Sequence, residues 1–188
     1  KRNFGALKMQ PVKPGQKLRH SPHRKTTRKP SEVPLNSGEG VRAAYYVEDD
    51  PASYSSLKQH IHQIDLLFPE WIHIVTPDGS LTSYSLDNRP FAVVDASGVH
   101  GVDHEQRVAR TIADAHEDTE IFPLVNNYDP VTGMFQPSVG DFLTNPASRA
   151  HFLQQMDRFL AANPNYLGIS LDFEEIPDKA QSGYMALL

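Results

Sequence analysis

The stretch that decides the fold is Gly168-Ile169-Ser170-Leu171-Asp172-Phe173-Glu174-Glu175-Ile176-Pro177. It predicts a short buried strand over residues 166–173. Successive side chains of a strand point to opposite faces, so Ser170, Asp172 and Glu174 are expected on one face. Two acids on one face of an otherwise apolar strand are costly unless they are used, which points to a functional site. The structural alternative is an acidic strand end that caps a helix or pairs with Arg.

Strands and helices alternate over residues 41–188. We expect strands at 41–47, 71–75, 121–126 and 166–173, helices at about 53–68, 103–116 and 145–162, and short extended pieces at 81–84 and 91–94. The first helix is expected to begin at Ser53 or Ser55 and to carry Leu67 and Phe68 on its apolar side. The third is expected to begin at Asn145 or Ser148. Apolar strands separated by helices indicate a parallel sheet covered by helices.

Four such units make half of a (β/α)₈ TIM barrel, which places the chain in the α/β class. A whole barrel needs about 250 residues, and this sequence has 188. We therefore expect residues 41–188 to be the N-terminal half of a barrel, about four β/α units, in a truncated sequence. A small open α/β sheet that is complete in itself is the alternative.

The charge distribution separates residues 1–40 from the rest. Residues 1–30 hold ten of the eighteen Lys and Arg and no acid, whereas the remaining residues carry eight basic and twenty-three acidic side chains. We expect residues 1–40 to be a disordered, basic, Pro-rich arm. The arm is either a solvated linker or a contact to anionic lipid headgroups or an anionic polymer, and the second reading also allows a lipid-surface protein. The acidic remainder disfavours nucleic acid as a partner. The chain has no cysteine, which excludes disulfides and thiolate metal sites.

Residues 41–188 resemble glycoside hydrolase family 18. The stretch 168–177 is similar to the family's fourth-strand signature D-G-x-D-x-D-x-E, and most similar to the variant G-V-N-I-D-F-E-N-V-P of spore-cortex peptidoglycan hydrolases. Ala43-Ala44-Tyr45-Tyr46-Val47 resembles the first barrel strand, and Pro123-Leu124-Val125-Asn126-Asn127 the third. Residues 46–78 also resemble the opening of family-18-like domains in bacterial envelope proteins that carry a polysaccharide deacetylase and a glycosyltransferase.

The resemblance implies roles for two acids. Glu174 matches the general acid that protonates the leaving oxygen, and Asp172 matches the acid that orients the 2-acetamido group of the substrate. The acetamido carbonyl is then the nucleophile, which is the substrate-assisted exception to the usual two-carboxylate scheme. Leu167 and Ser170 stand where the family has Asp. Ser170 cannot share a proton with Asp172, so we expect weakened activity.

Substrate-binding candidates lie near the strand ends. They are Ser170, Tyr45, Tyr46, Asn126 and Asn127, with Trp71 as a further aromatic residue. The tyrosines and Trp71 could stack on sugar rings, and ordinary core packing is the alternative. Asn126 or Asn127 could donate a hydrogen bond to sugar, and turn formation is equally open. His100 and His104 have a metal-like spacing, but Gly101 favours a loop, so we expect no metal.

The sequence therefore predicts a glycoside hydrolase that acts on chitin, poly-N-acetylglucosamine or peptidoglycan with retention at the anomeric carbon. A non-catalytic glycan-binding module of an envelope polysaccharide-modifying protein is the alternative. No metal or organic cofactor is implied, and the partners are the glycan and covalently linked deacetylase and glycosyltransferase domains. The substrate class implies a location in the cell envelope. Expressed alone, half a barrel is expected to be inactive, because its sheet edges and core stay unpaired.

Overall fold

The structure is a computed structural model that describes residues 40–48, 50–85, 87–100, 105–115 and 117–188. The predicted basic arm, apart from Gly40, lies outside the described residues, as does His104. Residues 41–188 form one compact unit. No helix among the described residues is long and apolar enough to cross a membrane.

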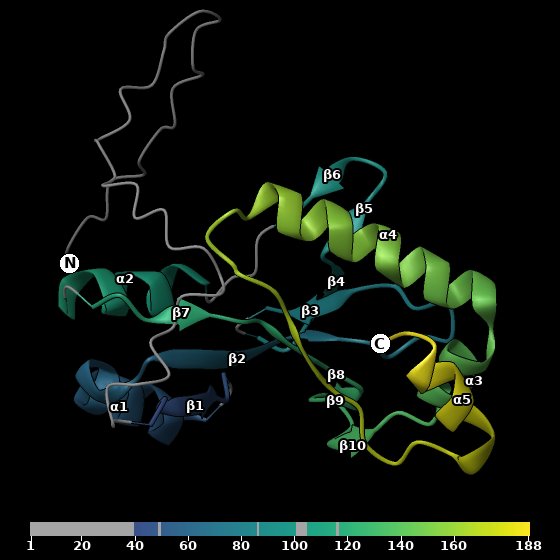
Figure 1. The fold of residues 1–188 in the computed structure, drawn as a ribbon, viewed down its shortest axis with the longest axis horizontal. Helices are drawn as coiled ribbons and strands as arrows, with labels where there is room; N and C mark the ends of the chain where they lie inside the picture. Colours follow the sequence, from purple (N-terminus) through teal and green to yellow (C-terminus); the bar gives the residue numbers. More distant parts are fainter. Residues whose placement is uncertain (1–39, 49, 86, 101–104, 116) are drawn as a thin grey trace, which may run out of the picture. The chain divides into compact units, whose positions relative to one another are not determined.

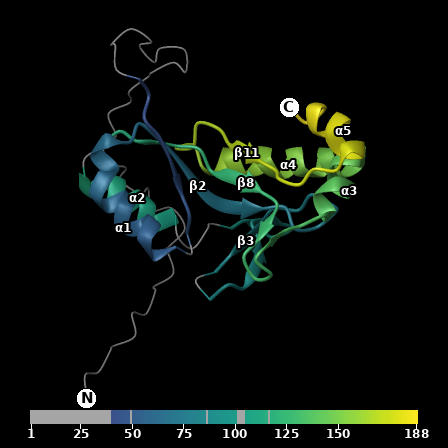
Figure 2. The same cartoon turned by 90° about the horizontal axis from the view of Figure 1, so that it is seen from below.

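Four segments of the chain form parallel strands that are neighbours in chain order. Strand β2 (Leu66–His73) pairs in parallel with β1 (Ala43–Tyr46) and with the next segment, which Pro123 divides into β7 (Glu120–Ile121) and β8 (Leu124–Asn126). Strand β11 (Ser170–Asp172) pairs in parallel with β8. Figure 2 shows β2, β8 and β11 side by side. The predicted parallel α/β arrangement is confirmed for these strands.

Antiparallel pieces extend this arrangement. Strand β3 (Thr82–Tyr84) pairs with the end of β2, and β4 (Pro90–Ala92) pairs with β3. Two small hairpins follow along the chain. They are β5 (Val94–Asp95) with β6 (Gly98–Val99), and β9 (Tyr128–Asp129) with β10 (Met134–Phe135).

Two helices begin with a similar local pattern, a capping Asp or Asn followed by Pro-Ala. Helix α1 (Pro51–His60) follows Asp50-Pro51-Ala52, and Asp50 accepts a hydrogen bond from the Ala52 N–H at 2.8 Å. Helix α4 (Pro146–Ala162) follows Asn145-Pro146-Ala147, and Asn145 accepts from the Ala147 N–H at 2.9 Å. An acidic or amide cap followed by Pro in the first turn satisfies an otherwise unbonded N–H. Asn145 is confirmed as a cap, whereas the prediction of Ser53 or Ser55 is wrong.

The expected first helix is too long at its other end. Helix α1 passes into a single 3₁₀ turn, η1 (Ile61–Gln63), and Leu67 and Phe68 belong to β2. Pro69 disfavours helical backbone at the residue before it. Asp65 also bonds Arg42, the residue before β1, with its carboxylate 2.8 Å from the Arg42 backbone N. This contact holds the residue before β2 next to the residue before β1, where the parallel pairing of the two strands starts.

Helices cover one face of the parallel strands. The core combines strand residues such as Leu67 and Val125 with Leu57 of α1, Val108 of α2 (Glu105–Ala115) and Phe152 of α4. Helices α1 and α2 lie side by side in both views (Figures 1 and 2), and Arg107 of α2 stacks on Tyr54 of α1 at 4.5 Å.

The C-terminal end of the chain packs around α3 (Ser138–Thr144). A 3₁₀ turn, η2 (Asp178–Ala180), and α5 (Gln181–Met185) both lie against it (Figure 1). Gly183 allows a very close approach, since a Cβ at that position would lie 1.9 Å from the Leu143 carbonyl oxygen.

Candidate active site at the carboxyl ends of the parallel strands

Strand β11 shows the predicted alternation of side chains. Ile169 and Leu171 pack against the core and Phe173 lies in it, with its ring 5.9 Å from those of Phe142 and Tyr184. Ser170 is half-buried and Asp172 is exposed. The strand is shorter than the expected 166–173, because Tyr166 makes only an isolated bridge to Ile121 before β11 begins at Ser170. The period-two pattern is nevertheless confirmed.

Asp172 belongs to a row of three residues on neighbouring strands. It is the register partner of Asn126 in β8, and Asn126 is the register partner of His73 in β2. Register partners on neighbouring strands project to the same face of a sheet. The row lies at the carboxyl ends of the strands, where parallel α/β folds place their binding sites.

Glu174 lies just beyond the end of β11, and its side chain is exposed. Its backbone is held by the buried side chain of Asn127. The Asn127 Oδ1 accepts from the Glu174 N–H at 2.9 Å, and the Asn127 Nδ2 donates to the Glu174 carbonyl at 3.0 Å. Asn127 therefore fixes the chain at Glu174 through bonds to backbone groups, and a direct contact of Asn127 with sugar stays a prediction.

The chain turns sharply after Glu174. Glu175 has a φ of 54°, in the left-handed region that residues other than Gly rarely adopt. Pro177 then packs so closely on α3 that a Cβ at Gly140 would lie 2.9 Å from the Pro177 Cγ. The segment 174–177 is thus defined by contacts at both ends.

Asn126 connects the row to β2. Its Nδ2 donates to the Glu70 carboxylate, and its Oδ1 accepts from the Tyr128 N–H at 3.1 Å. The same Oδ1 lies 2.7 Å from the His73 Nδ1. Because Oδ1 can only accept, Nδ1 of His73 must carry the hydrogen. The Asn126 Oδ1 thus has two donors within the protein, and a direct contact of Asn126 with sugar stays a prediction.

A second polar contact lies beside this network. The Tyr84 hydroxyl donates to the Asp129 Oδ1 at 2.9 Å, and the Tyr84 ring meets the His73 ring edge-on at 5.1 Å. Burial raises the pKa of Tyr84 well above its ordinary value, and the Asp129 carboxylate raises it further. Burial opposes ionisation of Asp129, but hydrogen bonds from the Val131 N–H, Tyr84 and Thr132 bring its pKa below the ordinary value.

A cavity of about 270 Å³ opens at the carboxyl end of β2, and we call it the β2 cavity. Residues that line it include Glu70, Trp71, His73, Tyr84, Arg107 and Tyr128. Neither Asp172 nor Glu174 is among the described residues that line it. The sequence analysis missed Glu70, His73, Tyr84 and Asp129. Glu70 and His73 interrupt the otherwise apolar sequence of β2, and this pattern could have indicated that β2 contributes to a site.

The aromatic candidates separate into two groups. Tyr46 and Trp71 are each 1% exposed and pack in the core, the alternative that the sequence left open. The Tyr46 hydroxyl accepts from Arg107 at 2.9 Å. Tyr45 is instead 69% exposed, and its ring lies 5.4 Å from Phe68, which lies 5.8 Å from Phe122. A sugar-stacking role stays a prediction for Tyr45.

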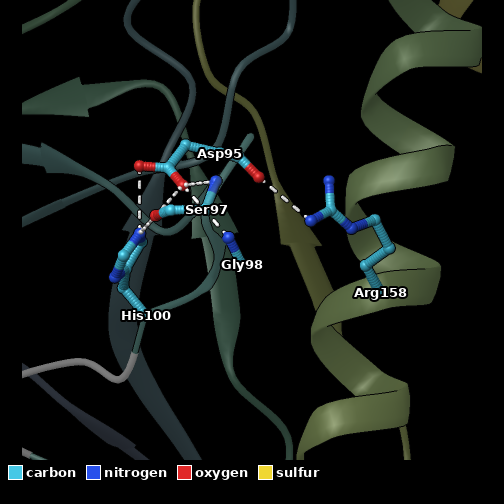
Figure 3. A network of polar contacts seen from close by, with 5 residues as sticks. All are labelled: Asp95, Ser97, Gly98, His100 and Arg158. Atoms are coloured by element: carbon cyan, nitrogen blue, oxygen red, sulfur yellow. Dashed lines mark hydrogen bonds and ion pairs between the residues drawn. The ribbon is translucent and has the colours of Figure 1, made fainter.

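A polar cluster on the β5–β6 hairpin has a structural explanation (Figure 3). Asp95 accepts from the Ser97 N–H and hydroxyl, at 2.7 and 2.6 Å, and pairs with the His100 Nε2 at 3.0 Å. These bonds, led by the Ser97 hydroxyl, hold the pKa of Asp95 below its ordinary value. Arg158 of α4 donates to the Asp95 carbonyl at 3.0 Å. The contacts fix the hairpin to α4, and no group of potential metal ligands occurs among the described residues.

Solved structures with a similar fold include three chitinases. A class V chitinase from Pseudomonas fluorescens Pf-5 is 21% identical, with a TM-score of 0.58 over 79% of this chain and 39% of its own. A chitinase from Chromobacterium violaceum is 13% identical, with a TM-score of 0.57 over 79% of this chain and 40% of its own. A class V chitinase from Nicotiana tobaccum is 17% identical, with a TM-score of 0.55 over 79% of this chain and 37% of its own.

The described fold is therefore similar to part of the class V chitinase fold, and the resemblance to family 18 is confirmed at the level of the fold. The chain spans about two fifths of the length of these chitinases. Comparisons with family models and with curated proteins found no match.

Proposed function

We propose that this chain, which has the fold of the family 18 class V chitinases, is part of a glycoside hydrolase that cleaves glycans containing N-acetylglucosamine. The observation that carries the proposal is the position of Asp172 and Glu174. Asp172 is the last residue of a parallel strand, and Glu174 follows two residues later on a backbone held by Asn127. Active sites of (β/α)₈ enzymes lie at this end of the strands. Among the similar structures is a mutant of the tobacco enzyme in complex with NAG4.

The proposed reaction needs one acid and one orienting carboxylate. Glu174 gives its proton to the leaving glycosidic oxygen. Asp172 holds the 2-acetamido group, whose carbonyl oxygen attacks the anomeric carbon and forms an oxazolinium ion. Water then opens this ion, returns a proton to Glu174 and leaves the product with retained configuration. The exposure of both side chains fits groups that must reach a polymeric substrate.

We also infer that β1, β2, β7 with β8, and β11 are the first four strands of a (β/α)₈ barrel. Two observations support this. The strands are parallel neighbours in chain order, and the chain matches 37–40% of each chitinase. In a barrel the row Tyr45–Phe68–Phe122 would face the interior, opposite the helices. A location in the cell envelope and linked deacetylase and glycosyltransferase domains belong to the same proposal and rest on the sequence resemblance.

The test is turnover of a chitobiose-type fluorogenic substrate by the protein that contains this chain. We expect Glu174→Gln and Asp172→Asn each to lower kcat by roughly 100-fold or more, the usual effect of losing a general acid or its partner. Glu175→Gln is the matched control, since it removes an adjacent exposed carboxylate and should leave kcat within about twofold. Equal rates for the unmodified protein and Glu174→Gln would remove Glu174 from the mechanism.

A non-catalytic glycan-binding module is the second candidate. It is favoured by Leu167 and Ser170, which stand where family 18 has acids. Such a module would bind N-acetylglucosamine oligosaccharides but give no turnover in the unmodified protein. The same assay, combined with a binding measurement, separates the two candidates.

A further inference from the structure

The β9–β10 hairpin connects Tyr84 with the segment that carries Glu174. Its two strands have two residues each and form a separate two-stranded sheet. A two-stranded hairpin alone is marginally stable at best in water. The position of this hairpin therefore depends on the side-chain contacts that attach it to the rest of the protein.

Asp129 of β9 supplies the contacts at one end of the hairpin. Its Oδ1 accepts from the Tyr84 hydroxyl of β3 at 2.9 Å and from the Val131 N–H at 3.0 Å. Its Oδ2 accepts from the Thr132 hydroxyl at 2.9 Å and lies 3.4 Å from the Gln136 Nε2. One carboxylate thus closes the turn of the hairpin and attaches the hairpin to β3.

Gln136, the residue after β10, supplies the contacts at the other end. Its N–H donates to the Asn127 carbonyl at 2.8 Å, and its carbonyl accepts from the Asn127 Nδ2 at 3.2 Å. An amide nitrogen carries two hydrogens, so the same Nδ2 can donate to the carbonyls of Gln136 and Glu174 together. The hairpin therefore holds the Asn127 amide in the orientation in which it binds the Glu174 backbone.

We infer that Asp129 is a positioning residue for Glu174. Asp129 fixes the hairpin, the hairpin fixes the amide of Asn127, and Asn127 fixes the backbone at Glu174. A contiguous hydrogen-bond network of this kind can couple distant positions energetically. The role of Glu174 as a reacting acid rests on the proposed function, whereas the position of its backbone does not.

Hydrogen exchange tests the positioning directly. The Glu174 N–H donates to the buried Asn127 side chain, so it should exchange slowly in the intact protein that contains this chain. The Ser170 N–H, which donates to the Pro123 carbonyl at 3.0 Å, is the internal reference. We expect Asp129→Ala to raise the exchange rate at Glu174 about tenfold relative to that at Ser170, as loss of an ordinary hydrogen bond does. The ratio of the two rates removes any general loss of stability.

Further variants make the exchange test specific. Asp129→Asn keeps an oxygen that can accept from Tyr84 and Val131, so it should leave the ratio within about twofold of the unmodified protein. Tyr84→Phe removes only the contact with β3 and should raise the ratio roughly fivefold. Asp95→Ala is the matched control, because Asp95 closes the turn of the β5–β6 hairpin through similar bonds, and it should leave the ratio unchanged. A ratio unchanged in Asp129→Ala, or in Tyr84→Phe where Asp129→Ala does not fold, would overturn the inference.

Turnover gives a second readout. With Glu174 as the acid, Asp129→Ala should lower kcat roughly tenfold and leave KM within about twofold, since the acid is misplaced while the substrate still binds. Asp129→Asn should recover most of the loss. A raised exchange ratio with an unchanged kcat would overturn the inference, as would an equal fall of kcat in Asp95→Ala. Absence of turnover in the unmodified protein would contradict the proposed function instead, and the exchange ratio would then decide the inference alone.

Discussion

Asn127 binds the backbone of Glu174 through both atoms of its amide, with the Oδ1 2.9 Å from the Glu174 N and the Nδ2 3.0 Å from the Glu174 O. Asn127 is buried at the end of β8, whereas Glu174 is exposed beyond the end of β11. One buried side chain thus determines where the proposed acid leaves its strand.

Removing this clamp should lower both stability and activity. We expect Asn127→Ala to reduce the free energy of unfolding by about 2 kcal/mol, because it removes both hydrogen bonds that the buried Asn127 side chain makes to the Glu174 backbone. It should lower kcat more than it changes KM, since Glu174 would be held less firmly. Chemical denaturation and turnover measure the two effects. Asn165→Ala, in an exposed turn, is the control. An unchanged kcat would show that Asn127 does not position Glu174.

The Tyr84–Asp129 contact should depend on pH at both extremes. The pKa of Tyr84 is raised in the folded state, so its contribution is present below pH of about 10 and is lost as the pH rises. The pKa of Asp129 is lowered, so its contribution is present above pH of about 4 and is lost as the pH falls.

We therefore expect Tyr84→Phe to cost about 2 kcal/mol between roughly pH 5 and 9, and less outside that window. Urea unfolding at several pH values checks this. The control is Tyr54→Phe, because the Tyr54 hydroxyl lies 3.5 Å from Thr111 Oγ1 and makes at most a weak bond. A loss for Tyr84→Phe that is the same at every pH would contradict the assignment.

The close contact between α5 and α3 predicts a strong steric effect. Gly183→Ala would place a Cβ 1.9 Å from the Leu143 carbonyl oxygen. We expect a loss of about 2 kcal/mol or more, since the backbone must move apart. Thermal unfolding measures the change. Gly168→Ala is the matched control and should cost little, because its Cβ would make an ordinary 3.5 Å contact with Phe122. Equal midpoints for the two variants would mean that α5 does not pack as described.

The start of α1 allows a direct test of the cap. Asp50→Ala removes the acceptor of the Ala52 N–H and should cost about 1 kcal/mol. Ser55→Ala should have little effect, because the Ser55 hydroxyl only donates to the Pro51 carbonyl within the exposed first turn. Denaturation midpoints compare the two. If Ser55→Ala lowered the stability more than Asp50→Ala, the cap would be Ser55, as one of the sequence predictions had it.

Local patterns predicted the elements well. Apolar alternation in 169–173 identified a strand that the structure confirms, and Asn145 was correctly among the expected starts of α4. Leu67 was wrongly placed in a helix because it continues the apolar side that begins with Leu57 and Ile61. In the structure it lies in a strand, which Pro69 and the Arg42–Asp65 contact favour. The second of these signals joins residues that are distant in the sequence.

The candidate site was only partly predictable for the same reason. Asp172 and Glu174 were found from a contiguous motif. Asn127 clamps a residue 47 positions away, and the contact of Tyr84 with Asp129 spans 45 positions. No periodicity encodes such pairs. The irregular register of β2, which leaves Trp71 as an extra residue opposite β8, is visible only when the two strands are compared.

The absence of a side chain at Gly140 has a consequence for evolution of this site. Pro177 occupies the space that any larger residue at position 140 would need. A substitution there would press on the segment that comes straight after the left-handed turn at Glu175. Helix α3 contains none of the proposed reacting groups. Even so, the substitutions that it tolerates at Gly140 should be limited by how precisely Asp172 and Glu174 must be positioned.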